Sequence, residues 1–378
     1  MKKLLVLLLA VVMVFGLVAC GGETEPKDDS TVANTTEHDH DHDHDHENEN
    51  EAPSAVTVET VYGSVEVPYA PERVCVLNGD MLDIMVALGL GDSVTCVRTT
   101  NEYPAYLESY YTSETIIQLN TSTKNLPEGT DPMEPYYSID ADLIIASVQE
   151  IDQEKYDVLC QIAPTVVLDY VSNHADGMYA GVKANAKAIA SIWGVEATVD
   201  ELTASYDELY AQLQAAAEGK TCVIAKGKAD MNSIQVQANN NDPAADDEAV
   251  KDNERAGLLL NELGFINLSN ETPEEVSMNA TSKAVKEAGE DTEAVAAVAK
   301  SITDWIESAD PDYLWVIDKS YSSLEEVQAA GFDYLYVTDL TVYAEGGFHF
   351  LAKEWTLARG GLTGMFTMLD QLAGILLN

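Results

Sequence analysis

Histidine and aspartate alternate in one short segment near the start of the chain. Its histidines are His38, His40, His42, His44 and His46. Imidazole nitrogens are good ligands for borderline divalent metals, so the segment predicts binding of zinc, nickel or copper. A soluble low-complexity linker has the same composition, and a flexible strip must lose chain entropy to close a metal site. Both interpretations stay open.

Tyrosines and two further histidines are the next candidates for contact with a ligand. The tyrosines are Tyr103, Tyr106, Tyr110, Tyr111, Tyr136 and Tyr137. A phenol ring can stack on a ligand, and a phenolate can bind ferric iron or haem. Outside the strip, His174 and His349 carry imidazoles that could bind iron, haem or a bare metal. We take Tyr137 and His349 as candidate ligand-binding residues, with core packing or a plain polar role as the alternative.

The sequence contains no motif of a common enzyme class. It has no GxSxG, HExxH or P-loop pattern. Gly89-Leu90-Gly91 lacks the third glycine of a dinucleotide-binding loop and follows a predicted helix instead of preceding one. We therefore expect a protein that is not an enzyme and has no intrinsic cofactor. A secreted hydrolase remains an alternative, because isolated Ser, His and Asp residues can meet in space.

Charge excludes one class of partner. The chain carries 65 acidic and 20 basic residues, a formal net charge of -45. Such a surface repels nucleic acid and anionic lipid, so no nucleic-acid role is expected. The acidity itself does not identify a ligand.

The N-terminus predicts export. Lys2 and Lys3 precede the apolar residues 4–18, a run shorter than the about 20 residues of a membrane span. Leu17-Val18-Ala19-Cys20 follows and resembles a bacterial lipobox. That resemblance implies that residues 1–20 are a signal peptide and that Cys20 carries the lipid which anchors the chain outside the cell membrane.

The other cysteines show no metal-binding or redox spacing, since no CxxC occurs. They are Cys75, Cys96, Cys160 and Cys222. We expect buried thiols that act as small hydrophobic side chains. Disulfides are possible in an extracytoplasmic compartment, but the sequence does not assign pairs.

Composition and periodicity divide the rest of the chain. Residues 21–54 lack apolar periodicity and predict a disordered acidic tether. A hairpin is expected at 56–67, and β and α segments then alternate. Expected strands are 73–77, 94–97, 142–147, 165–168, 221–226, 313–318 and 334–338, and expected helices are 81–90, 177–193, 199–217, 255–263 and 364–377.

This alternation predicts an α/β fold with two Rossmann-like lobes and a ligand cleft between them. The first lobe is expected at 55–172 and the second at 197–378, with one long interlobe helix at 173–196. A single helical connector permits less hinge bending than two or three crossing strands would.

Several segments together resemble one family, the substrate-binding proteins of ABC importers for iron-siderophores, haem and cobalamin (the single-helix-linker, class III type). They occur in the family's order at 71–74 (PERV), 88–92 (LGLGD), 141–147 (ADLIIAS), 156–169 (YDVLCQIAPTVVLD), 310–319 (DPDYLWVIDK) and 355–362 (WTLARGGL). The resemblance covers the chain from about residue 56 to its end, and it depends on order and spacing more than on any single motif.

The resemblance implies several ligand-binding side chains. Arg255 matches a second-lobe arginine, and Lys319 matches the arginine at the end of the second-lobe strand. Val148 and Gln149 stand where the family can have a first-lobe arginine, so this cleft is expected to be less cationic than the family's pattern. Arg98 and Arg359 are the candidates that could supply the positive charge of the missing first-lobe arginine. Arginine suits an anionic chelate because its planar fork is always charged.

The resemblance also implies partners. One acidic residue on each lobe would dock on basic permease loops, and Asp83 and Glu262 lie near those positions. We expect a monomeric lipoprotein that captures a ferric siderophore or similar metal chelate in its cleft and delivers it to the permease and ATPase of an importer. The alternative from another class is a surface lipoprotein that buffers zinc or nickel through the His/Asp strip.

Overall fold

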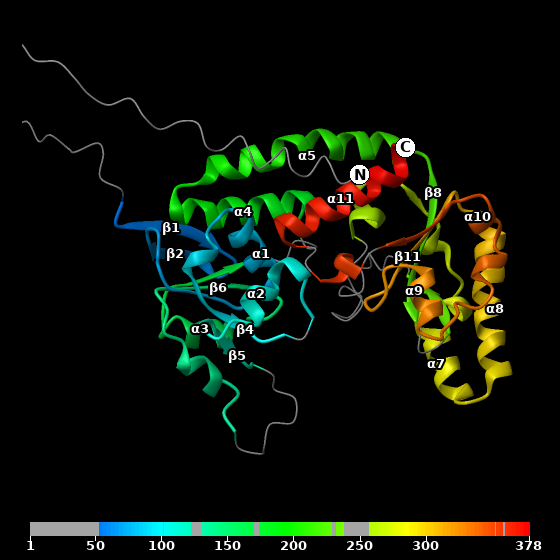
Figure 1. Ribbon diagram of the computed structural model, residues 1–378, viewed down its shortest axis with the longest axis horizontal. Coiled ribbons are helices and arrows are strands. Elements are labelled where there is room, and N and C mark those ends of the chain that lie inside the picture. Colours follow the sequence, from blue (N-terminus) through cyan, green and yellow to red (C-terminus); the bar gives the residue numbers. More distant parts are fainter. Residues whose placement is uncertain are drawn as a thin grey trace, which may run out of the picture. The chain divides into compact units, whose positions relative to one another are not determined.

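Two five-stranded sheets built around parallel strands organise the computed structural model. The structure describes residues 53–100, 102–121, 130–169, 174–228, 232–237, 257–351, 353–357 and 360–378, and these belong to one unit, residues 52–378. Figure 1 shows the sheets with helices packed beside them. Within the described ranges, no helix combines the length and apolar character that a membrane span requires.

The first sheet is parallel throughout, with the strand order β5-β4-β3-β6-β7. Its strands are β3 (Val74–Val76), β4 (Val94–Arg98), β5 (Ile117–Leu119), β6 (Leu143–Ser147) and β7 (Thr165–Leu168). Every residue of β3, β6 and β7 is buried, as expected for parallel strands covered on both faces. The strands predicted at 73–77, 94–97, 142–147 and 165–168 are confirmed.

An antiparallel hairpin precedes this sheet, as the alternating pattern predicts. It joins β1 (Ala55–Thr60) to β2 (Gly63–Pro68). Gly63 has φ +109, a conformation that costs glycine nothing because it has no Cβ. The turn of the hairpin therefore lies where the Tyr62-Gly63 pair indicates it.

Short helices connect the strands of the first sheet. They are α1 (Gly79–Ala87), α2 (Glu108–Tyr111) and α3 (Gln153–Leu159). Helix α1 begins directly after β3, and the Asn78 side chain caps it by accepting hydrogen bonds from the backbone N–H groups of Asp80 and Met81. This places the N-terminus of α1 at the carboxyl end of β3.

Two long helices lie between the last strand of the first sheet and the first strand of the second, where the sequence predicts helices at 177–193 and 199–217. They are α4 (Met178–Trp193) and α5 (Glu196–Ala217). Gly194 ends α4 in the left-handed conformation, φ +66. Helix α5 leads directly into the second sheet, and the single helix expected at 173–196 corresponds to the first member of this pair. The domain boundaries stay a prediction.

The second sheet has the parallel order β10-β8-β11-β12, and β9 pairs with β8 in the antiparallel direction. Its strands are β8 (Thr221–Lys228), β9 (Ser233–Val236), β10 (Ile266–Asn267), β11 (Tyr313–Ile317) and β12 (Phe348–Leu351). Its helices are α7 (Met278–Ala288), α8 (Thr292–Ala309), α9 (Leu324–Ala329) and α10 (Thr341–Ala344). The closing helix, α11 (Leu362–Leu376), is where the sequence predicts it.

Two expected elements differ from the structure. Residues 334–338 form no strand, because Tyr336 takes φ +67 and a 3-10 helix, Val337–Asp339, follows it. The buried Tyr334 hydroxyl instead donates a hydrogen bond to Asp318 at 2.6 Å. The helix expected at 255–263 is a π-helix, Leu258–Glu262, within the described part of the chain.

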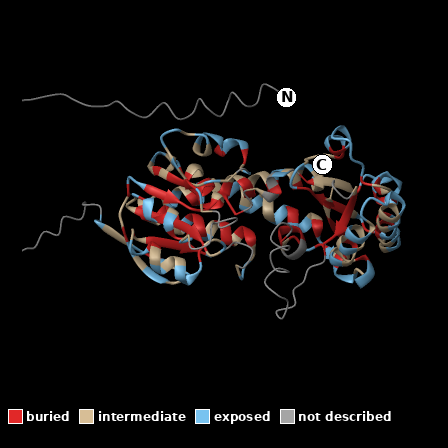
Figure 2. Cartoon of the chain, turned by 90° about the horizontal axis from the view of Figure 1, so that it is seen from below, coloured by how far each residue is buried: buried red, intermediate tan, exposed pale blue. Residues whose placement is uncertain are grey.

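One hydrophobic cluster connects the two halves of the chain. It combines residues of the first sheet, such as Val76, with residues of the second, such as Trp315, through α4, α5 and α11. Two further clusters cover the remaining faces of the two sheets. Figure 2 shows the buried residues concentrated in the strands and on the inner faces of the helices. Figure 1 shows α4, α5 and α11 side by side, in agreement with their contacts.

Candidate functional site

A cavity of about 150 Å³ lies at the carboxyl ends of three parallel strands. Asn78 follows β3, Arg98 ends β4, and Glu150 follows β6. The wall continues through Thr100, Glu102, Tyr103, Pro104 and Tyr111, and Leu357 from the C-terminal part of the chain contributes to it. Loops after parallel strands converge at this edge of a sheet, which makes it the usual place for ligands in open α/β sheets.

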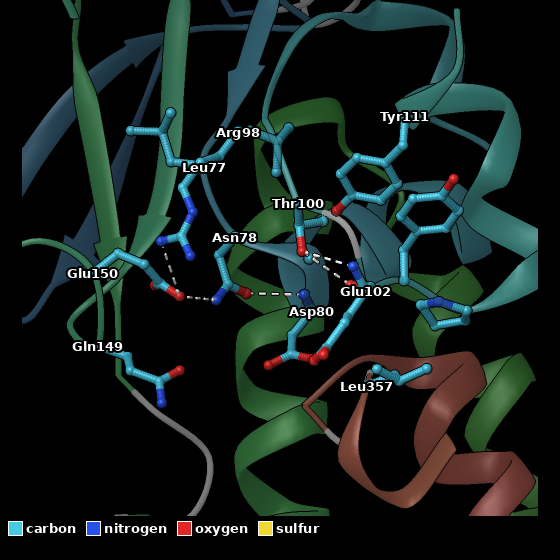
Figure 3. A pocket seen from close by; sticks show the side chains of 14 residues that line it. Leu77, Asn78, Asp80, Arg98, Thr100, Glu102, Tyr111, Gln149, Glu150 and Leu357 are labelled. Carbon is cyan, nitrogen blue, oxygen red and sulfur yellow. Dashed lines mark hydrogen bonds and ion pairs between the residues drawn. The ribbon is translucent and has the colours of Figure 1, made fainter. Parts of the chain in front are cut away.

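Glu150 is the centre of a polar network in this cavity. Its Oε1 accepts a hydrogen bond from Asn78 Nδ2 at 2.8 Å and lies 3.7 Å from Arg98 Nη1. Its Oε2 accepts a hydrogen bond from Ser147 Oγ at 2.9 Å. Figure 3 shows Arg98 and Asn78 both directed at the Glu150 carboxylate. The positive charge of Arg98 is therefore compensated within the wall of the cavity.

The Glu150 carboxylate is far less exposed than its partner guanidinium, with side-chain exposures of 12% and 39%. Burial raises the pKa of Glu150, and the hydrogen bond from Asn78 and the charge of Arg98 lower it in part. The donors hold Glu150 in place, whereas Arg98 keeps part of its surface open. A ligand in the cavity would meet this pair as one unit.

Two stacked tyrosines form another wall. The rings of Tyr103 and Tyr111 have centroids 4.7 Å apart and an interplanar angle of 15°. Burial, together with the charge of Asp80, raises the pKa of Tyr111 to about 12. Tyr111 is thus a neutral phenol at physiological pH, suited to ring stacking and to hydrogen bonding. Figure 3 places Tyr111 across the cavity from Glu150.

The structure places the predicted ligand-binding residues in different environments. Arg98 lines the cavity. Tyr137 is 58% exposed on a 3-10 helix, Glu134–Ser138. Lys319 is exposed directly after β11. Arg255 and Arg359 lie outside the described residues, so their roles stay predictions.

His349 belongs to strand β12, where its ring lies 5.1 Å from the Trp315 ring and 5.8 Å from the Tyr313 ring, measured between centroids. It is only partly buried, and burial lowers the pKa of its imidazole. A neutral imidazole packed on aromatic rings fits a sheet position, and it does not line the cavity at the ends of β3, β4 and β6.

Asp83 requires a correction to its predicted docking role. Its side chain is 0% exposed. It accepts hydrogen bonds from the backbone N–H groups of Thr363 at 3.0 Å and Gly364 at 2.9 Å, and from Tyr106 Oη at 2.7 Å. Asp83 therefore caps α11, whose N-cap residue, Gly361, has no side chain of its own. A carboxylate enclosed in this way cannot reach a permease.

Glu262 has the corresponding role at α4. Its carboxylate accepts hydrogen bonds from Met178 N at 2.6 Å, Tyr179 N at 3.4 Å and Tyr210 Oη at 3.1 Å. The N-cap of α4 is Gly177, again without a side chain to cap the helix. A second cavity, of about 360 Å³, lies beside this carboxylate, but the oxygens of Glu262 are already used in capping.

The remaining predicted sites lie outside the described residues. They are Cys20 and the metal-binding strip His38, His40, His42, His44 and His46. In the part of the chain that the structure describes, no group of three or more His, Cys, Asp or Glu side chains is arranged to hold a metal ion. Four described cysteines are free, and three of them are buried, as predicted; Cys160 is exposed.

Sequence reasoning missed Asn78, Asp80 and Glu150 as cavity residues. All three follow the end of a confirmed parallel strand by two to four residues. Because the carboxyl ends of parallel strands meet at one edge, polar residues just after each strand were the signal available.

No protein-family model matches this sequence, and no curated protein matches it significantly. Solved structures do resemble it. One is the petrobactin-binding protein YclQ of Bacillus subtilis, with a TM-score of 0.59 and 22% identity over 85% of this chain and 98% of that chain.

Two further structures show the same similarity. The catecholate-siderophore binding protein VctP of Vibrio cholerae has a TM-score of 0.60 and 16% identity, covering 85% of this chain and 99% of that chain. The iron uptake ABC transporter substrate-binding protein PiuA of Streptococcus pneumoniae has a TM-score of 0.57 and 20% identity, with the same coverage, 85% and 99%. The predicted fold is confirmed: this chain has the two-lobe α/β fold of the periplasmic substrate-binding proteins.

Proposed function

We propose that this chain is an extracytoplasmic substrate-binding protein that captures a metal chelate, such as a ferric siderophore, and delivers it to an ABC importer. The observation that carries the proposal is the cavity at the carboxyl ends of β3, β4 and β6, in a fold shared with siderophore-binding proteins. Its polar network and stacked tyrosines suit a ligand that combines polar edges with flat rings.

In this proposal Cys20 carries a lipid that holds the protein at the outer face of the membrane, and residues 21–54 give the folded part reach. The chelate enters the cavity and contacts Arg98 and the stacked tyrosines. Arg255 and Arg359 are proposed to complete the site from the second half of the chain. The loaded monomer then docks on the permease, and ATP hydrolysis by the importer drives release. No step requires this chain to act as an enzyme.

Calorimetric titration of the chain from residue 21 onward tests the proposal. The panel contains ferric siderophores, haem, a corrinoid, zinc and nickel. We expect one-to-one binding of a chelate with a dissociation constant below about 1 µM, within the affinity range of specific recognition. Zinc or nickel binding without any chelate binding would instead favour metal buffering by the His/Asp strip.

A pair of tyrosine variants locates the site. Tyr103→Ala removes a ring that lines the cavity and stacks on Tyr111. Tyr137→Ala removes a ring that is 58% exposed and outside that cavity. We expect Tyr103→Ala to weaken chelate binding at least tenfold and Tyr137→Ala to leave it unchanged. The reverse result would move the binding site to the Tyr137 surface.

A further inference from the structure

Two cysteines lie opposite each other on neighbouring parallel strands of the first sheet. Cys75 is the middle residue of β3, and its register partner on β4 is Cys96. A bulge creates this pairing, because Val74 pairs with Val94, whereas the next residue, Cys75, skips one position of β4 and pairs with Cys96. The extra residue, Thr95, therefore decides that the two thiols share one row of the sheet.

The two cysteine side chains also project from the same face of the sheet. Val94 and Cys96 are two residues apart, and strict alternation along a strand would place both on one face. Instead, Val94 belongs to the hydrophobic cluster that connects the two halves of the chain, whereas Cys96 belongs with Cys75 to the cluster on the other face. The bulge thus brings both sulfurs to one side, where each cysteine is at most 1% exposed.

The spacing of the strands fits a disulfide. Neighbouring strands lie about 4.8 Å apart, within the Cα···Cα range of about 4.4–6.8 Å that disulfides span. The thiols are already in contact: the hydrogen bond between them and burial raise the pKa of Cys75, and the same bond lowers the pKa of Cys96, although burial opposes this. The other described cysteines lie elsewhere, Cys222 buried in β8 of the second sheet and Cys160 exposed at the end of α3.

We propose that Cys75 and Cys96 close to a disulfide that ties β3 to β4. These two strands supply Asn78 and Arg98 to the cavity, so the bridge fixes the relative position of two strand ends that form its wall. Extracytoplasmic compartments favour disulfides, and the export that the N-terminus predicts would place the chain in one. The inference depends on the strand register and not on the identity of the ligand.

Closure is a thiol–disulfide exchange with a low-molecular-weight disulfide such as oxidised glutathione. The Cys96 thiolate attacks one sulfur of that disulfide, which forms a mixed disulfide and releases one small thiolate. The Cys75 thiolate then attacks the Cys96 sulfur, which forms the protein disulfide and releases the second small thiolate. Two protein thiols are thereby oxidised, the small disulfide is reduced to two thiols, and these take up the two protons. Because both cysteines are buried in the folded chain, exchange takes place while β3 and β4 pair, before packing excludes the oxidant.

Peptide mapping of the chain from residue 21 onward tests the pairing. The reduced, unfolded protein is refolded with reduced and oxidised glutathione, then unfolded again in the presence of N-ethylmaleimide. Trypsin releases residues 74–98 as one peptide, because no Lys or Arg lies between Arg73 and Arg98. We expect this peptide to carry no label and to be two hydrogens lighter than the dithiol, while Cys160 and Cys222 are labelled. Two labels on this peptide, or a link from it to Cys160 or Cys222, would overturn the proposal.

A stability comparison tests whether the bridge ties the strands. The oxidised wild type should melt at least about 3 °C above the reduced wild type, because the cross-link restricts the unfolded chain. Cys96→Ala should abolish this difference between the two forms. Cys222→Ala removes an equally buried thiol, from β8, and should keep it. Comparison of the two forms of each variant cancels the cost of the substitution itself, and equal melting of the two wild-type forms would refute the stabilising role.

Discussion

The cap that Asp83 provides to helix α11 gives a sharp test of the structure. Asp83 and Gly364 are 281 residues apart, yet the carboxylate accepts hydrogen bonds from the backbone N–H groups of Thr363 and Gly364 and from the Tyr106 hydroxyl. Asp83→Ala leaves these donors without a partner in a buried site. Helix α11 packs against α1, α4 and α5, so the loss weakens the contact between the two halves of the chain.

The expected magnitude follows from the kind of bond. Hydrogen bonds to a charged group each contribute about 1.5–3 kcal/mol, and relief of the burial cost of the carboxylate offsets part of their sum. Each neutral donor left unsatisfied in a buried site costs about 1–3 kcal/mol, and after this offset we expect Asp83→Ala to lower the free energy of unfolding by about 3 kcal/mol. Urea unfolding followed by circular dichroism measures it.

Asp291 supplies a matched control. It also caps a helix, α8, by accepting hydrogen bonds from the backbone N–H groups of Glu293 at 3.0 Å and Ala294 at 3.1 Å, but it is exposed. Asp291→Ala should cost about 1 kcal/mol, the typical value for an N-cap. If Asp83→Ala is no more destabilising than Asp291→Ala, the reasoning about the buried cap is wrong.

The pH dependence of Asp83 provides a second readout. Burial raises the pKa of Asp83 in the folded protein, although its hydrogen bonds lower it in part. The folded state therefore holds the proton more tightly than the unfolded state, and this contribution to stability is lost as the pH rises through the folded pKa. The stability difference between the wild type and Asp83→Asn should accordingly widen as the pH falls from 7 toward the ordinary aspartate value of about 3.9.

Other parts of the chain give further predictions. Glu262→Ala removes the cap of α4 and should lower the free energy of unfolding by about 2 kcal/mol, measured by urea unfolding. Gly177 has φ +97, and Gly177→Ala would place a Cβ 2.7 Å from the Glu262 carboxylate. Gly219→Ala is the control, because Gly219 has a similar φ of +76 but its Cβ would meet no atom within 4 Å. The Gly177 variant should therefore be less stable than the Gly219 variant by at least about 1 kcal/mol, and equal losses of stability would contradict the predicted clash. In the folded, reduced chain from residue 21 onward, a thiol reagent should label the exposed Cys160 quickly. The buried thiols of Cys75, Cys96 and Cys222 should react only after unfolding. Rapid labelling of all four in the native state would contradict the described core.

The sequence determined much of this fold by itself. Short β-branched runs such as 165–168, each buried on both faces, predicted parallel strands because only covered strands carry continuous apolar residues. Gly63 marked the hairpin turn because its φ of +109 favours glycine. These features depend on residues close together in the chain, and local pattern is sufficient to predict them.

Local pattern failed where a distant contact decided the outcome. Residues 334–338 alternate like a strand, but the Tyr334 hydroxyl is bound to Asp318 and Tyr336 takes a positive φ, so the segment turns instead. In the candidate site, the sequence identified Arg98 and the tyrosine group but not Glu150 and Asn78, because their importance comes from the neighbouring strand ends that bring them together.

Two acidic residues show most clearly what the sequence indicates and what only the tertiary structure decides. Asp83 and Glu262 read as surface charges in the sequence, since most carboxylates of so acidic a chain face water. Tertiary structure encloses them at the N-termini of α11 and α4, where the N-cap glycines have no capping side chain and these carboxylates accept the hydrogen bonds of the backbone N–H groups. Periodicity shows which face of an element is apolar, but only the packing of the whole chain decides which helix end a given carboxylate meets.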